Sequence, residues 1–104
     1  AKQMVYTARN IKADEALRIG LVNAVYPLAE LYAAAEKLAS QIAANAPIAV
    51  RAAKKAINEG LDLPMDEAVV VEEKAFGSCF ETADQQEGMG AFLEKRKHEP
   101  FTNK

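Results

Sequence analysis

Residues 82–97 read TADQQEGMGAFLEKRK, and this stretch predicts the last helix of the chain. The Thr82 hydroxyl can accept a hydrogen bond from the backbone N–H of Gln85 while the Gln85 side chain reaches back, which is the capping-box pattern of a helix start. Gly88 and Gly90 lie inside the predicted helix, where each costs up to about 1 kcal/mol relative to alanine. We therefore expect another part of the protein to approach the backbone closely at these two glycines.

The same stretch ends in an aromatic residue followed by cations. Phe92 precedes Lys95 by three positions, so a helix that continues this far places the ring and the ammonium group on one face. Lys95, Arg96 and Lys97 would then lie where the helix macrodipole favours positive charge. A flat apolar ring beside a cation predicts a contact site for a nucleotide-like group.

The composition indicates one folded, mainly α domain. The chain has 104 residues, of which 50% are hydrophobic and 27% charged. Its formal net charge of −2 gives no general electrostatic reason to bind nucleic acid or an acidic membrane surface. Cys79 is the only cysteine, so no disulfide forms within the chain and a cytoplasmic location is expected. No secretory signal or apolar run of about 20 residues is present, so we expect no membrane partner.

Further helices are predicted upstream of residues 82–97, at residues 1–8, 14–19, 28–44, 47–60 and 65–80. Gly20 and Gly60 suit the position after a helix end, and Pro47 suits a first helical position. Apolar residues recur at helical spacing in 28–44 and 47–60, which are expected to pair as an αα hairpin. The 65–80 helix is apolar on more than one side, so it should pack on more than one neighbour.

Two segments are not predicted to be helical. Residues 21–26 are rich in β-branched and aromatic types, which predicts at most one short strand, at about 22–25. A lone strand cannot satisfy its own hydrogen bonds, so its partner would lie outside this chain. Residues 100–104 are expected to form an extended tail that frays.

The residues alone identify no active site. There is no P-loop, dinucleotide fingerprint, nucleophile elbow or metal signature. His98 lies in the tail without an orienting partner, and Cys79 lies on an apolar helix face, so an inert histidine and a structural thiol are the expectations. Arg51, Lys54 and Lys55 form a basic helix face, which is either solvated or in contact with phosphate.

Three ordered segments nonetheless carry a recognisable pattern. They are NIKADEALRIGLVNAV at residues 10–25, NAPIAVRAAK at 45–54 and EGMGAFLEKRKHEPF at 87–101. Together these segments resemble the enoyl-CoA hydratase/isomerase family, the crotonases, and the resemblance extends over nearly the whole chain. The matching parts of that family form its C-terminal helical region, after the ββα spiral.

The resemblance implies that residues 1–104 are the C-terminal helical region of a crotonase-like fold. In the family, the N-terminal ββα spiral carries two catalytic glutamates and the oxyanion hole, and no segment here resembles it. Residue 1 is alanine and the first helix begins without a cap, so we expect that an upstream part is missing. The implied activity of the parent enzyme is hydration of 2-enoyl-CoA, or dehydration of 3-hydroxyacyl-CoA, in fatty-acid or butyrate-type metabolism. The chain alone is expected to be inactive.

The resemblance also implies a ligand site and an assembly. Phe76, Phe92 and Lys95 match family positions near the adenine and phosphate end of CoA, with a CoA thioester as substrate and no tightly bound cofactor. The parent would be a homo-oligomer, a trimer or a dimer of trimers. The alternative is that both phenylalanines are core or interface residues and that Lys95 is a solvated cation.

Other functions remain open from the sequence. The parent enzyme could be an isomerase or another crotonase-type enzyme, because the spiral would decide the chemistry. A helical oligomerisation module without a ligand is a second class, and nucleic-acid binding by the basic residues 95–97 is a third. In each case we expect the chain by itself to expose apolar helix faces and to self-associate.

Overall fold

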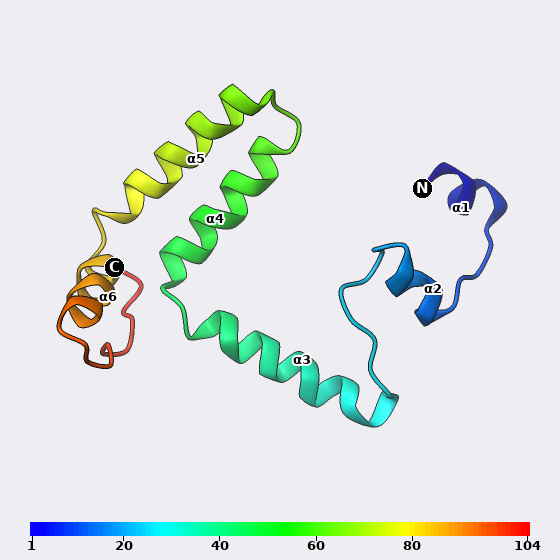
Figure 1. The fold of residues 1–104 in the computed structure, drawn as a ribbon, viewed down its shortest axis with the longest axis horizontal. Helices are drawn as coiled ribbons and strands as arrows, with labels where there is room; N and C mark the ends of the chain where they lie inside the picture. The colour runs from blue at the N-terminus through cyan, green and yellow to red at the C-terminus, as the bar shows by residue number, and fades with distance from the viewer. The chain divides into compact units, whose positions relative to one another are not determined.

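The computed structural model describes all 104 residues, and every regular element in it is an α-helix (Figure 1). This confirms the mainly α class. The elements are α1 (Lys2–Thr7), α2 (Ala13–Arg18), α3 (Leu28–Ala43), α4 (Pro47–Gly60), α5 (Met65–Cys79) and α6 (Ala83–Leu93). The chain divides into two compact units, Ala1–Lys37 and Leu38–Lys104, with α3 contributing to both. None of the helices is both long and apolar enough to cross a membrane.

The first unit is organised by the end of α2. Ala16 is buried there, and its carbonyl accepts hydrogen bonds from the backbone N–H groups of Leu21, at 2.9 Å, and Val22, at 3.4 Å. Gly20 has φ 73°, and its own N–H donates to the Leu17 carbonyl at 3.1 Å. These bonds form a Schellman motif, in which the left-handed residue reverses the chain and satisfies the last carbonyls. The predicted role of Gly20 is confirmed.

The strand predicted at about 22–25 is not present. Leu21 and Val22 turn back onto Ala16, so their N–H groups complete the end of α2 and are not free for a ladder. No other segment of the chain pairs with residues 23–25, which therefore lack the cross-strand bonds that define a strand. The residue types favoured an extended backbone, but the hydrogen bonding of the helix end took precedence.

In the second unit, α4 and α5 run side by side in opposite directions (Figure 1). Gly60 marks the end of α4 as predicted, and a Cβ placed on it would lie 3.4 Å from the Cβ of Ala68 on α5. Small residues therefore bring the two helix backbones close together. The hairpin predicted between residues 28–44 and 47–60 is wrong, because the packed pair is α4 with α5. Periodicity locates the apolar face of a helix but does not identify its partner.

The C-terminal tail is fixed to the start of α6 and does not fray. Asp84, which is only 3% exposed, accepts hydrogen bonds from the backbone N–H groups of Thr102, at 2.6 Å, and Asn103, at 2.9 Å, and from the Thr102 hydroxyl at 3.2 Å. The Asn103 side-chain oxygen in turn accepts from Arg51 Nη2 at 2.6 Å. The predicted fraying is therefore wrong, because a buried carboxylate supplies acceptors for the tail backbone. Arg51 of the predicted basic face contacts this tail.

Little of the apolar surface is buried within the chain. Ala16 and Ala91 are the buried apolar residues, while large apolar side chains on every helix are exposed. On α5, for example, Met65 and Phe76 are exposed although both lie on its apolar side. The expectation that the helices of the isolated chain expose apolar faces is confirmed.

Candidate functional site

The predicted ligand-contact region begins where α6 ends, and this end lies earlier than predicted. The last helical residue is Leu93, and the chain reverses at Lys95, which has φ 56°. Arg96 N donates to the Ala91 carbonyl at 3.0 Å, and Lys95 N donates to the Phe92 carbonyl at 3.2 Å. This is a second Schellman motif, with lysine in the left-handed position that glycine usually occupies.

The start of α6 is where it was predicted, but only one half of the capping box forms. Thr82 is the N-cap residue, and its hydroxyl accepts a hydrogen bond from Gln85 N at 3.1 Å. The Thr82 N–H donates to the Cys79 carbonyl at 3.1 Å and not to the Gln85 side chain. A Cβ placed on Gly88 would lie 3.7 Å from the Phe101 ring, and one on Gly90 would lie 3.8 Å from Arg96 Nη2. Both are ordinary van der Waals separations, so the expected close approach at these glycines is wrong.

The left-handed turn separates Lys95 from the helix face that carries Phe92. A left-handed backbone costs a residue with a Cβ roughly 1–2 kcal/mol. Because Lys95 lies beyond the helix, the rule that residues three apart share a helix face does not apply, and that argument for pairing it with Phe92 is wrong. Both residues are nevertheless exposed at the same end of α6, Phe92 at 76%.

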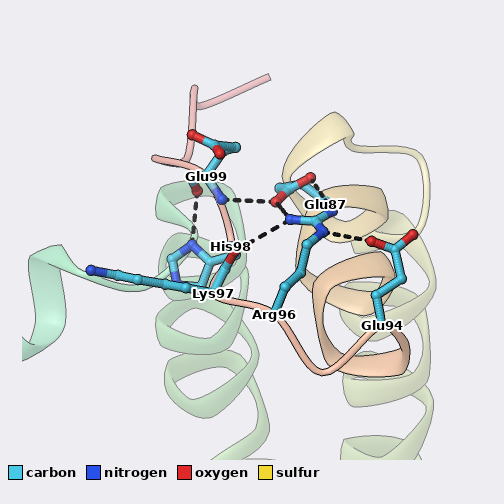
Figure 2. A network of polar contacts seen from close by, with 6 residues as sticks. All are labelled: Glu87, Glu94, Arg96, Lys97, His98 and Glu99. Atoms are coloured by element: carbon cyan, nitrogen blue, oxygen red, sulfur yellow. Dashed lines mark hydrogen bonds and ion pairs between the residues drawn. The ribbon is translucent and has the colours of Figure 1, made fainter.

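The Arg96 guanidinium lies between two carboxylates and holds the turn in place (Figure 2). Its Nη1 and Nη2 donate to Glu87 Oε1 and Oε2 at 2.6 and 3.1 Å, and its Nε donates to Glu94 Oε2 at 2.6 Å. Nη1 also lies 3.3 Å from the Lys97 carbonyl, and Glu87 Oε1 accepts from the backbone N–H of Glu99 at 2.8 Å. We call Glu87, Glu94 and Arg96 the clasp. It joins the middle of α6 to the chain on both sides of the turn.

The clasp shifts the ionisation of its members. The side-chain hydrogen bond from Arg96, followed by the backbone hydrogen bond from Glu99, lowers the pKa of Glu87 from 4.5 to about 2. The hydrogen bonds to Glu87 and then to Glu94 raise the pKa of the Arg96 guanidinium. Both groups are therefore charged near neutral pH, where their hydrogen-bonded ion pair can form.

This lowered pKa predicts a pH dependence of stability. Because the pKa of Glu87 is depressed in the folded chain, its contribution is fully present above its ordinary value of 4.5 and is lost as pH falls toward about 2. The difference in free energy of unfolding between the unaltered protein and Glu87→Gln should therefore shrink over that interval. Urea unfolding of both proteins between about pH 6 and about pH 2 measures it, with Glu72→Gln as an exposed control. A difference that stays constant over the whole range would contradict the assignment.

Phe76 lies in a different environment from Phe92 and Lys95. It is 65% exposed, packs edge-on against Phe80 at a centroid distance of 5.1 Å, and lines a groove of about 620 Å³ between α4 and α5. The groove is largely apolar, with alanines on the α4 side and Met65, Val69, Phe76 and Cys79 among the residues on the α5 side. Neither Phe92 nor Lys95 lines it. Phe76 thus lies on a groove that includes neither of the other two predicted site residues. Phe92 and Lys95 are joined at the end of α6 through their backbones, where Lys95 N donates to the Phe92 carbonyl.

The remaining candidates have local roles. The Cys79 thiol lies 3.3 Å from the Ala75 carbonyl, a contact within α5. The His98 ring stacks on Phe101 at a centroid distance of 4.3 Å, and its Nδ1 is 2.8 Å from the Glu99 carbonyl. These two rings, together with Lys97 and Pro47, help to line a second hollow of about 530 Å³. No three His, Cys, Asp or Glu side chains are grouped so that they could hold a metal ion.

Sequence reasoning placed Arg96 among the cations at the helix end and did not pair it with Glu87. Their separation of nine positions matches no helical pairing rule, because the contact depends on the chain reversal at Lys95. The sequence does show opposite charges before and after the helix end. These charges predict a contact only when the chain reversal at Lys95 is known.

The chain is similar to known proteins in both sequence and structure. The enoyl-CoA hydratase/isomerase family profile matches residues 1–104. A short-chain-enoyl-CoA hydratase of Clostridium acetobutylicum is 54% identical over 104 residues, which is 100% of this chain and 40% of that protein. A crotonyl-CoA hydratase of Syntrophomonas wolfei is 54% identical over 97 residues, which is 93% of this chain and 37% of that protein.

Solved structures show the same similarity. The crystal structure of an enoyl-CoA hydratase from Bacillus anthracis superimposes with a TM-score of 0.91 at 39% identity, covering 99% of this chain and 40% of that one. The chain thus spans about two fifths of the length of the relatives that it matches. Since the profile match runs from the first residue to the last, this chain belongs to the enoyl-CoA hydratase/isomerase family.

Proposed function

We propose that this chain is the C-terminal helical region of a cytoplasmic enoyl-CoA hydratase that adds water to short-chain 2-enoyl-CoA thioesters. Its part in that enzyme is to contribute to subunit assembly in a trimer or a dimer of trimers and to supply one end of the CoA site, with no tightly bound cofactor. The names of the relatives, hydratases of short-chain enoyl-CoA and of crotonyl-CoA, support this substrate class.

The observation that carries the ligand-site proposal is the distribution of charge at the end of α6. Of the three consecutive cations, Arg96 is bound by Glu87 and Glu94, whereas Lys95 and Lys97 make no ion pair. Lys95 is exposed on the same end of the helix as the exposed ring of Phe92. An unpaired ammonium group suits a phosphate, and an exposed ring suits stacking on a base. These are the two chemical features of the nucleotide end of CoA.

A lysine substitution tests this site in the intact protein, meaning this chain together with the rest of the proposed enzyme. Lys95→Ala is expected to weaken CoA binding about tenfold, because one charged contact to a phosphate is lost. Titration calorimetry measures the change in Kd. Lys74→Ala, which removes another exposed and unpaired cation from α5, should leave the Kd unchanged. An unaltered Kd for Lys95→Ala would remove Lys95 from the ligand site.

An oligomerisation module without a ligand role is the second candidate. The exposed apolar residues that line the groove between α4 and α5, including Met65 and Phe76, favour it. Under this alternative, Phe76→Ser would change the oligomeric state seen by sedimentation, and CoA binding would be unaffected by any substitution at Phe92 or Lys95. A loss of CoA affinity in Lys95→Ala with an unchanged oligomer would reject the alternative.

A further inference from the structure

The turn that presents Lys95 is one that lysine does not favour. Lys95 has φ 56°, whereas the equivalent turn after α2 uses Gly20, with φ 73°. The strain of about 1 kcal/mol or more persists only where the surroundings determine the conformation. At Lys95 those surroundings are the two Schellman hydrogen bonds and the clasp. In the clasp Arg96, which follows Lys95, donates to Glu87, and Glu87 also accepts from the backbone N–H of Glu99.

We propose that Glu87 and Arg96 are positioning residues, which hold the left-handed turn so that the Lys95 ammonium group is presented to a phosphate of the CoA ligand. This inference rests on the proposed function, because it takes Lys95 to be a ligand contact. Neither Glu87 nor Arg96 touches the ligand. Their effect is to fix the backbone from which Lys95 projects.

Arg96 itself is not available as the phosphate-binding cation. A guanidinium has five N–H donors, and Arg96 uses Nε, Nη1 and Nη2 to contact Glu87, Glu94 and the Lys97 carbonyl. With its two carboxylates the clasp carries a formal charge of −1, so it does not attract an anion. Lys97 also makes no ion pair, but Lys95 occupies the left-handed position, so Lys95 is the unpaired cation that the turn itself carries.

Because the clasp is negatively charged, an electrostatic effect and a positioning effect predict opposite changes in CoA affinity for Glu87→Gln. Glu87→Gln removes a negative charge that contacts Arg96, the residue after Lys95, so simple electrostatics predicts tighter binding of an anionic ligand. Loss of positioning predicts the opposite. A glutamine offers one oxygen where Glu87 uses two to accept from Arg96 and the Glu99 N–H, so the clasp cannot form completely.

The experiment is a double-mutant cycle in the intact protein, with CoA affinity measured by calorimetry at fixed salt. Glu87→Gln is expected to weaken CoA binding about fivefold in the presence of Lys95 and to have no effect in the Lys95→Ala background. Glu81→Gln, an exposed carboxylate without a side-chain partner, removes the same charge as a control. If Glu87→Gln does not fold, Glu94→Ala provides a milder cycle, because it removes the single bond from Arg96 Nε and leaves Glu87 in place.

Each outcome decides the question. Tighter binding in Glu87→Gln, or unchanged binding, would overturn the positioning role while Lys95 remains a ligand contact. An equal loss in the Lys95→Ala background would also overturn it, since the effect would then be a general loss of structure. If Lys95→Ala by itself has no effect, the proposed CoA contact fails and the positioning role fails with it.

Discussion

Asp84→Ala is expected to lower the free energy of unfolding by about 3 kcal/mol and to release the C-terminal tail. The carboxylate is 3% exposed and accepts hydrogen bonds from two backbone N–H groups and one hydroxyl in residues Thr102 and Asn103. Hydrogen bonds to an ionised group contribute about 1.5–3 kcal/mol each to stability. Removing the Asp84 carboxylate also leaves its donors without a partner. Thr102 and Asn103 should then no longer be held against α6, and the contact between Asn103 and Arg51 should be lost with them.

Urea unfolding measures the stability change in the intact protein, and hydrogen exchange at the Thr102 and Asn103 amides reports the tail directly. Asp84→Asn should show an intermediate effect, because one side-chain oxygen remains as an acceptor. Asp66→Ala is the control, since Asp66 is an exposed first-turn residue of α5 and should cost well under 1 kcal/mol. Protection of both amides in Asp84→Ala at the level of the unaltered protein would show that other contacts fix the tail.

The isolated chain is expected to leave a crotonyl thioester unhydrated, whereas the same chain joined to the rest of a hydratase should be active. Adding water to an enoyl thioester needs donors at the developing enolate oxygen and a held acid or base. Asp84 is the buried polar side chain here, and its oxygens already accept hydrogen bonds from the tail. None of the other carboxylates is buried. Glu72 lines the groove between α4 and α5 and Glu99 lines the second hollow, each as the single carboxylate there.

Replacing the matching segment of the Clostridium acetobutylicum enzyme with this chain provides the comparison, because the two are 54% identical over 104 residues. Loss of the enoyl absorbance measures activity in the chimera and in the chain alone. The chain alone should also associate through its exposed apolar faces, which sedimentation detects. Hydration by the purified chain without any added segment would contradict the proposal, and a compact monomer that melts cooperatively would contradict the expected association.

The local signals in the sequence were sufficient for most of the helices. Gly20, Pro47 and the Thr82–Gln85 pair mark helix ends correctly, because each acts through its own backbone conformation or through a bond three residues away. Phe76 was also predicted on the correct helix, α5. The sequence did not identify the helix that packs on α5, since an apolar stripe fits any apolar surface.

Errors occurred where distant parts of the chain compete for the same backbone groups. The strand at 22–25 failed because Ala16 captures the N–H groups of Leu21 and Val22, and the frayed tail failed because Asp84 binds Thr102. The end of α6 was misplaced because lysine stands where glycine is expected. Its left-handed conformation is maintained by bonds that cross the turn and not by its own preference.

The sequence by itself determined the helical class, the positions of the helix starts and the family, because these depend on short-range bonding and on residue patterns that are read along the chain. Only the tertiary structure decided which cation at the end of α6 is paired. Arg96 is neutralised by Glu87 once the chain reverses, and Lys95 and Lys97 are left unpaired. Electrostatic pairing depends on distance in space, and the reversal at a single left-handed residue sets that distance.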